Sequence, residues 1–279
     1  MKHNLSLIAC AALLLALLVF WLPAQAQTFQ EYSLSKNLQA GAIVPGPEGA
    51  LWYGIASSSE STQYEIGKIT TGGAVTLSSA TPFCAGGGEI AVGSDGAIWV
   101  AAAGSHRISR ITTAGSMSCY DTPSDPRSIA VGPDGAFWYT SDQEKIGRIT
   151  TSGTVTEFSL PSGVIGAGAI TTGPDGALWF TEPAVQRIGR MSTSGAVTEF
   201  QLPRLGKFAV NGGIATGPDG NLWFVENAGN KIGRITTSGT FAEFSIPTPS
   251  SSPNGITTGP DGALWFIEYG GNKIGRITT

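Results

Sequence analysis

Short apolar segments alternate with turns rich in Gly, Pro and Ser along the chain after its first 26 residues. The cleanest copy reads Gly-Pro-Asp-Gly at 259–262, Ala-Leu-Trp-Phe-Ile-Glu at 263–268 and Lys-Ile-Gly-Arg-Ile-Thr at 273–278. Proline fixes φ at the second position of a tight turn, and glycine takes the last position without steric cost. The segments that follow are rich in aromatic and β-branched residues, which favours strands. No part of this region has a sustained 3.6-residue apolar repeat, so the pattern predicts an all-β protein.

The turn-and-strand unit occurs six times, and each copy has one tryptophan shortly after its turn. The tryptophans are Trp52, Trp99, Trp138, Trp179, Trp223 and Trp265, separated by 47, 39, 41, 44 and 42 residues. One copy cannot bury its own apolar faces, so successive copies must pack against each other. A period near 42 residues built from strands and turns is typical of propeller blades.

Each repeat is long enough for four antiparallel strands, but the chain stops after the third strand of the sixth copy. Residues 29–32 (Phe-Gln-Glu-Tyr) are similar to the missing fourth strand, and residues 28–279 amount to about six periods. We therefore predict a six-bladed β-propeller of four-stranded antiparallel blades. We expect the N-terminal strand to join the last blade and close the ring.

The Ser-Gly turns before the fourth strands give a prediction of register. If Ser152 and Gly153 form a two-residue hairpin loop, Arg148 faces Glu157. The same reasoning pairs Arg190 with Glu199, Arg234 with Glu243 and, at ring closure, Arg276 with Glu31. Such exposed ion pairs contribute roughly 0–1 kcal/mol each, so we take them as markers of register and not as sites.

The N-terminal segment, residues 1–26, has the features of a secretory signal peptide. Lys2 precedes an apolar run that ends near Leu22, and Ala24-Gln25-Ala26 has the small-x-small form of a cleavage site. A retained membrane anchor is the alternative. We expect cleavage, a propeller domain at 27–279, a secreted or periplasmic location, no membrane contact afterwards and a monomeric state.

Charge and cysteine content restrict the partners. The chain has 16 basic and 20 acidic residues and no basic stripe, which argues against a nucleic-acid partner. We expect instead a small-molecule or peptide ligand at the propeller rim or channel. Outside the leader the cysteines are Cys84 and Cys119, and a disulfide between them and two free buried thiols are equal alternatives.

An acidic residue recurs three positions after the tryptophan in the last three repeats, as Glu182, Glu226 and Glu268. If these strand ends face one rim, the carboxylates form an acidic arc suited to Mg²⁺ or Ca²⁺, because hard cations prefer oxygen ligands. The alternative is that this Glu belongs to the repeat framework, since it recurs with the repeat.

Residues that break the repeat are stronger functional candidates. The position before each inner strand is Gly41, Gly88, Arg127, Gly168, Gly212 and Asn254. Glu89 is a further break, and it either lines the channel or pairs with Arg127. His106 precedes the third strand of the second repeat and is a candidate base only if it reaches the channel rim. The candidate catalytic residues are therefore Glu89, Arg127, Asn254 and His106.

The segments Val-Thr-Glu-Phe, Ile-Thr-Thr-Gly-Pro-Asp-Gly-Ala-Leu-Trp-Phe-Thr-Glu and Ile-Gly-Arg-Ile-Thr closely resemble the virginiamycin B lyase, or streptogramin lyase, family. The resemblance covers residues 28–279 and consists of turn and strand framework. It implies a seven-bladed enzyme that opens a cyclic depsipeptide antibiotic at its ester by elimination. The implied machinery is a divalent metal, magnesium, held by carboxylates, with histidine as general base or acid.

Two departures from that family bear on activity. The family has histidine just before the inner strand in a Pro-His-Gly-Ile context, whereas this chain has Asn254 between Pro253 and Gly255. The chain also has room for six blades. Three hypotheses follow: a ligand- or partner-binding member without the catalytic histidine, an active metal-dependent lyase that uses Glu89 or His106, and a metal-dependent lactonase or esterase.

Overall fold

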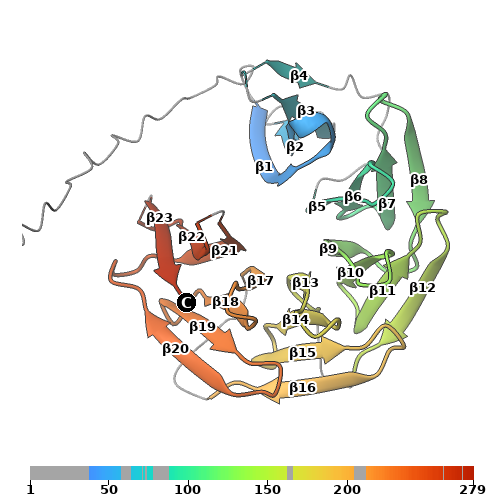
Figure 1. Cartoon of the computed structure of the whole chain (residues 1–279). Coiled ribbons are helices and arrows are strands. Elements are labelled where there is room, and N and C mark those ends of the chain that lie inside the picture. The colour runs from blue at the N-terminus through green and yellow to red at the C-terminus, as the bar shows by residue number, and fades with distance from the viewer. Residues whose placement is uncertain are drawn as a thin grey trace, which may run out of the picture. The chain divides into compact units, whose positions relative to one another are not determined.

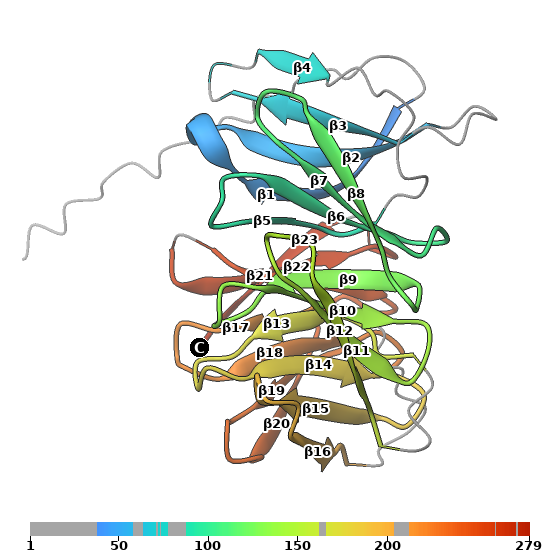
Figure 2. The same cartoon turned by 90° about the vertical axis from the view of Figure 1, so that its right-hand side faces the viewer.

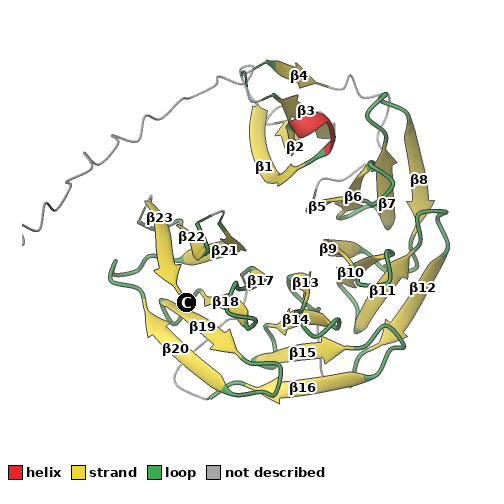
Figure 3. Cartoon of the chain, viewed as in Figure 1, coloured by secondary structure: helices red, strands yellow, loops and turns green. Residues whose placement is uncertain are grey.

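The computed structural model describes residues 38–57, 64–70, 72, 74–77, 88–161, 166–203, 212–259, 261–271 and 273–279. All of them belong to one compact unit, Leu34–Thr279. Strands dominate, and the helical structure of the described residues is the short 3₁₀ turn η1 (Pro47–Gly49), red in Figure 3. Within these ranges no helix is long and apolar enough to cross a membrane.

Six antiparallel sheets follow each other along the chain. Blade 1 contains β1 (Leu38–Pro45), β2 (Leu51–Ser57), β3 (Tyr64–Ile69) and β4 (Val75–Leu77). Blade 2 contains β5 (Ile90–Val92), β6 (Ile98–Ala102), β7 (Arg107–Ile111) and β8 (Met117–Asp121). Blade 3 contains β9 (Pro126–Val131), β10 (Phe137–Ser141), β11 (Lys145–Ile149) and β12 (Val155–Ser159).

Blade 4 contains β13 (Ile170–Thr172), β14 (Leu178–Glu182), β15 (Arg187–Met191) and β16 (Val197–Gln201). Blade 5 contains β17 (Ile214–Thr216), β18 (Leu222–Glu226), β19 (Lys231–Ile235) and β20 (Phe241–Ser245). Blade 6 contains β21 (Pro253–Thr258), β22 (Ala263–Glu268) and β23 (Lys273–Thr278).

The sheets are arranged in chain order around a central axis, with the first strand of each blade innermost and the last outermost (Figure 1). Figure 2 shows the same blades from the side. The predicted six-bladed propeller is confirmed. Five blades have four strands and the sixth has three among the described residues. The strand expected to complete it, residues 29–32, lies outside the described residues.

The Gly-Pro-Asp-Gly turn is built as its sequence predicts, and its aspartate also organises the blade. Asp134 Oδ1 accepts a hydrogen bond from Trp138 Nε1 at 3.0 Å, and Asp134 Oδ2 binds Arg148 Nε at 2.6 Å. The last glycine, Gly135, has φ 74°, a conformation that side chains disfavour. Burial raises the pKa of Asp134, but the hydrogen bonds from Trp138 and Arg148 outweigh burial and hold the pKa below its ordinary value. The turn therefore fixes the tryptophan of the second strand and the arginine of the third strand.

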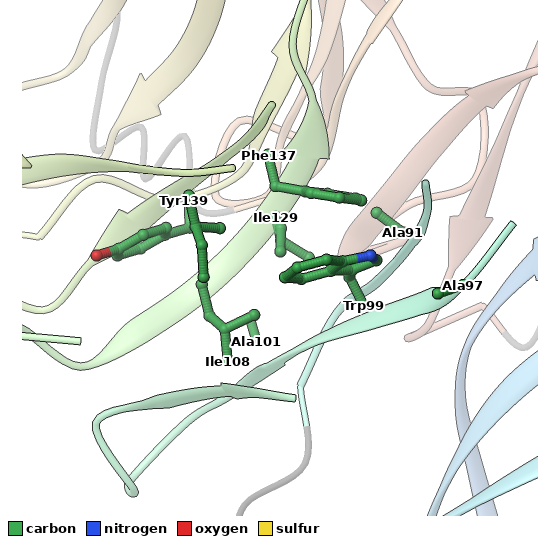
Figure 4. Packing of buried hydrophobic residues seen from close by; sticks show 9 residues of the cluster. Ala91, Ala97, Trp99, Ala101, Ile108, Ile129, Phe137 and Tyr139 are labelled. Atoms are coloured by element: carbon green, nitrogen blue, oxygen red, sulfur yellow. The ribbon is translucent and has the colours of Figure 1, made fainter. Parts of the chain in front are cut away.

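The core lies in the seams between successive blades. Trp99 of blade 2 stacks on Phe137 of blade 3, with ring centroids 4.5 Å apart (Figure 4). Trp138, Trp179 and Trp223 are buried in the corresponding seams farther along the chain. Burying large aromatic rings in this way supplies much of a fold's apolar stabilisation. The repeat thus buries its apolar faces against its neighbours.

The predicted register of the outer hairpins is wrong by one residue. Glu157 lies opposite Gly147, and Arg148 lies opposite Thr156. The loop is longer than two residues, because Thr150 and Thr154 pair through a backbone hydrogen bond of 3.0 Å around Gly153. A one-residue shift moves side chains to the other face of the sheet. The framework arginines therefore bind the turn aspartates.

The outer-strand glutamates bind a different set of cations. The pairs are Lys145 with Glu157, Arg187 with Glu199 and Lys231 with Glu243. Arg276 binds Asp261 at 2.7 Å, and Glu31 lies outside the described residues.

Cys119 on β8 forms a disulfide bond. The interpretation of this residue as a free thiol is therefore wrong. Its expected partner, Cys84, lies outside the described residues, so that pairing stays a prediction.

Candidate functional site

A cavity of about 560 Å³ lies where the inner ends of five blades meet. It is lined by Glu89, Arg127, Ser128, Gly166, Ala167, Gly168, Ala169, Pro183, Ala184, Gly212, Gly213, Asn254 and Gly255. Most of these residues lie at the starts of inner strands or in the segments before them, and Pro183 and Ala184 lie in the β14–β15 turn. The cavity therefore forms one mouth of the central channel. Three of the four catalytic candidates, Glu89, Arg127 and Asn254, come together here.

The inner strands reach this mouth in two ways. In blades 2, 4 and 5 the inner strand has three residues and is preceded by Gly88, Gly168 or Gly212. A Cβ on Gly168 would collide with the side chain of Thr181, and one on Gly212 would collide with Val225. Gly168 and Gly212 therefore present only backbone to the cavity.

Blades 3 and 6 have a six-residue inner strand with a β-bulge instead. In blade 3 the pairing shifts so that Arg127 and Ser128 together oppose Thr140. In blade 6 the register shifts between Asn254 and Ile256. A bulge inserts an extra residue and redirects side chains. The bulges explain why the two large polar side chains at the starts of inner strands, Arg127 and Asn254, occur in these blades.

Arg127 has no hydrogen bond or ion pair with any part of the chain that the structure describes. The expected Glu89–Arg127 ion pair is therefore not formed. Glu89 binds Ser128 instead, whose hydroxyl donates to Glu89 Oε2. The Ser128 oxygen also accepts a 3.2 Å hydrogen bond from the backbone N–H of Ile170, which links blades 2, 3 and 4.

The carboxyl of Glu89 can be reached from the channel but is crowded by the surrounding protein. Loss of hydration raises the pKa of Glu89, and hydrogen bonds from Ser128 and the Ile129 backbone oppose that rise. Asn254 is exposed, and its Oδ1 accepts a 2.9 Å hydrogen bond from the N–H of Gly255. The mouth thus combines a guanidinium, an amide and a carboxyl with a raised pKa.

His106 does not line the cavity. It is exposed in the β6–β7 turn, and its backbone N–H donates to Asp125 Oδ1 at 3.1 Å. Its φ of 53° matches those of Gln186 and Asn230, which occupy the same turn position in blades 4 and 5. Histidine and asparagine are enriched in this left-handed conformation. The geometry gives His106 a role in the turn.

The glutamates of the expected acidic arc lie inside the blades. Glu182, Glu226 and Glu268 are buried, and both carboxylate oxygens of Glu182 and of Glu226 lack a hydrogen-bond partner among the described residues. No three acidic, His or Cys residues within the described ranges form a group able to hold a metal ion. The structure does not gather these carboxylates into one ligand set, and metal binding by them stays a prediction.

Two of these glutamates, Glu182 and Glu226, have raised pKa values. Burial raises the pKa of Glu182 to about 7, with the neighbouring Glu199 adding to the rise and Arg187 opposing it. Burial likewise raises the pKa of Glu226 to about 7, next to Glu243 and opposed by Lys231. In both blades, a carboxyl with a raised pKa thus lies beside an ion pair.

The described side chains of the mouth do not fit a divalent cation. They supply one carboxyl group, already bound by Ser128, and one amide oxygen, with the Arg127 guanidinium in the same cavity. Mg²⁺ and Ca²⁺ are held by several oxygen ligands, and a nearby cation opposes them. We therefore derive no chemical step through a metal.

The residues whose role in the site depends on strand pairing could not be identified from the sequence. Ser128 and Thr140 looked like ordinary strand residues, but Thr140 Oγ1 donates to the carbonyl of Gly168 at 2.7 Å and accepts from the N–H of Ser128. In blades 3 and 6 the bulge coincides with the replacement of the usual glycine by Arg127 and Asn254. The glycine pattern alone does not reveal the bulges, because blade 1 keeps Gly41 and also has a register shift between Ala40 and Ile43.

Fold and site together define a β-propeller with a polar cavity at the mouth of its central channel. The model of the virginiamycin B lyase family matches residues 23–163 and 86–279. The chain belongs to the virginiamycin B lyase family.

Solved structures agree with this assignment. The chain is 39% identical to a catalytically inactive histidine-to-alanine variant of virginiamycin B lyase from Staphylococcus aureus, crystallised with quinupristin. That match has a TM-score of 0.81 and covers 90% of this chain and 85% of the other. A streptogramin B lyase structure is 36% identical, with a TM-score of 0.80, and the match covers 90% of this chain and 83% of the other. No curated protein matches the chain.

Proposed function

We propose that this chain is a ligand-binding member of the virginiamycin B lyase family. Its ligand is a peptide-type molecule held at the channel mouth, and it does not catalyse the elimination that the family resemblance implies. The observation that carries this proposal is the cavity of about 560 Å³, which brings together Glu89, Arg127 and Asn254. Cavities of this size suit small ligands.

The residues of the channel mouth support the proposed absence of the elimination reaction. Asn254 stands where the family resemblance leads us to expect a histidine, and an amide does not take up a proton near neutral pH. The chain has two histidines, His3 in the leader and His106 in an exposed turn outside the cavity lining. No described residue therefore brings an imidazole to the cavity.

One observation favours a second candidate, an active lyase with Glu89 as the base. Glu89 lines the cavity, and loss of hydration raises its pKa above the ordinary value, the direction that suits a general base. No comparable observation favours a lactonase or esterase.

The test uses quinupristin, the compound crystallised with the relative from Staphylococcus aureus. Titration calorimetry of residues 27–279 should give saturable binding, and mass spectrometry after prolonged incubation with Mg²⁺ should recover the intact ring. A linear product that disappears in Glu89→Gln would establish the second candidate. Absence of binding would overturn both.

The proposed leader has a separate test. Expression of the full chain in a bacterium should release a protein that begins near residue 27 into the periplasm or medium. N-terminal sequencing of that fraction checks the cleavage site, and a protein that stays in the membrane would favour the retained anchor.

A further inference from the structure

Charge in the cavity is confined to two residues. Of the side chains that line it, Arg127 and Glu89 can ionise, and the rest are Gly, Ala, Pro, Ser and Asn. Arg127 carries a permanent positive charge, whereas loss of hydration disfavours the charged form of Glu89. The guanidinium of Arg127 is therefore the main fixed charge of the described cavity lining.

Arg127 differs from the arginines that build the framework. In blades 2 to 6 the third-strand arginine binds the aspartate of the tight turn. These residues are Arg110, Arg148, Arg190, Arg234 and Arg276. Arg107 and Arg187 also have acidic partners. Within the described ranges, Arg127 is the arginine with no carboxylate at ion-pair distance.

The acidic residues near Arg127 have other roles. Asp125 accepts hydrogen bonds from the backbone N–H groups of Gly104 and His106, and Asp142 accepts one from the N–H of Asp125. Nη1 of Arg127 lies instead close to Gly166, which has no side chain and also lines the cavity. The guanidinium is thus left available to a ligand.

Resting on the proposed function, we propose that Arg127 makes this cavity specific for a ligand with a free carboxylate, such as a linear peptide acid. The planar guanidinium fork matches a carboxylate with two parallel hydrogen bonds. One guanidinium balances a singly charged carboxylate but not a phosphate dianion. Asn254 adds an amide that can pair with a peptide bond of the same ligand.

The test compares two forms of one compound. Quinupristin closes its ring through an ester, and mild base converts that ester to a free carboxylate and a hydroxyl group. Calorimetry of residues 27–279 with the cyclic and ring-opened forms should show about tenfold tighter binding of the ring-opened acid, the scale of one charge-assisted contact. In Arg127→Gln the two affinities should agree within about twofold.

Two further variants make the test specific. Arg107→Gln removes an equal charge from an exposed pair outside the cavity and should keep the preference. Glu89→Gln removes the carboxyl group of the cavity lining and, because loss of hydration already disfavours its charged form, should strengthen binding of the acid by no more than about twofold. Unchanged thermal unfolding of Arg127→Gln would show that its effect is local.

The outcomes separate this inference from the proposed function. Binding of the acid alone would support the carboxylate site and overturn the proposal that the cyclic compound is bound. Equal binding of both forms by the unaltered protein, or a preference that survives in Arg127→Gln, would overturn the carboxylate site alone. Binding of neither form would overturn both.

Discussion

The blade seams and the channel mouth are built in opposite ways. In the seams the same residues recur: an aspartate holds a tryptophan and an arginine in blades 2 to 6, and the rings of blades 2 to 5 are buried. At the mouth the repeat is broken: blades 2, 3 and 6 contribute Glu89, Arg127 and Asn254, and blades 4 and 5 contribute glycines. Repetition serves stability because each blade must pack on the next. We therefore expect ligand recognition at the positions of the channel mouth that differ from blade to blade.

Truncation of a seam tryptophan should have the largest effect. Trp179→Ala removes a fully buried ring between blades 4 and 5 and should lower the free energy of unfolding by about 3–5 kcal/mol. Trp265→Ala is the matched control and should cost less, because Trp265 is only half-buried. Urea denaturation followed by circular dichroism measures both, and equal losses would contradict this view of the seams.

Removal of the strand expected to complete blade 6, which has three strands among the described residues, should have the second-largest effect. Ile274 is 64% exposed, whereas Ile146, Ile188 and Ile232 at the same position of blades 3 to 5 are buried. A chain that begins at residue 34, without the proposed closing strand, should be about 2–3 kcal/mol less stable than one that begins at residue 27, since burial of one such side chain is worth about that much.

Urea denaturation of the two chains checks this closure. Equal stability would show that residues 29–32 do not complete blade 6. By the register of the complete blades, Glu31 would lie opposite Gly275, as Glu157 lies opposite Gly147.

The buried glutamates should give a smaller effect that depends on pH. The pKa of Glu182 is about 7 in the folded protein, above its ordinary 4.5, so the folded state binds this proton more tightly. Stability should therefore fall as the pH rises from about 4.5 to about 7. Glu182→Gln should stabilise the protein by about 1–3 kcal/mol at pH 8 and change little at pH 4.5.

Blade 3 supplies the control for this effect. Burial raises the pKa of Glu157, but hydrogen bonds from Ser124 and Lys145 outweigh burial and lower it. Glu157→Gln should therefore destabilise the protein at pH 8. Denaturation curves at both pH values give the signs, and stabilisation by both substitutions would contradict the assigned pKa directions.

Substitution at the mouth should have the smallest effect on folding. Arg127 makes no ion pair or hydrogen bond within the described residues, so Arg127→Gln should change the free energy of unfolding by less than about 0.5 kcal/mol. Thermal unfolding measures this. A loss of 2 kcal/mol or more, on the scale of a buried contact, would place Arg127 in the framework.

Most of the architecture could be predicted from the sequence because it depends on local signals. Turn residues and the tryptophan period give the number of blades and the order of strands. Register could not be predicted, because the loop around Gly153 is longer than the Ser-Gly dipeptide suggests and the extra residue places Glu157 on the opposite face of the sheet from Arg148.

For the site, the sequence singled out Glu89, Arg127 and Asn254 as breaks in the repeat. It could not give the partner of Glu89, because the contact with Ser128 depends on the bulge opposite Thr140. Nor could it distinguish His106 from a channel residue, because its place depends on a turn conformation shared with Gln186 and Asn230.

The bulges of blades 3 and 6 have a consequence for engineering and for divergence within the family. Positions 127 and 254 can exchange side chains with little disturbance of the sheets, whereas a side chain at Gly168 or Gly212 meets the adjacent strand. A saturation library at 127 and 254 should retain mostly folded members, and one at 168 and 212 should lose most of them. New specificities of this propeller are therefore expected to arise through two of its six blades.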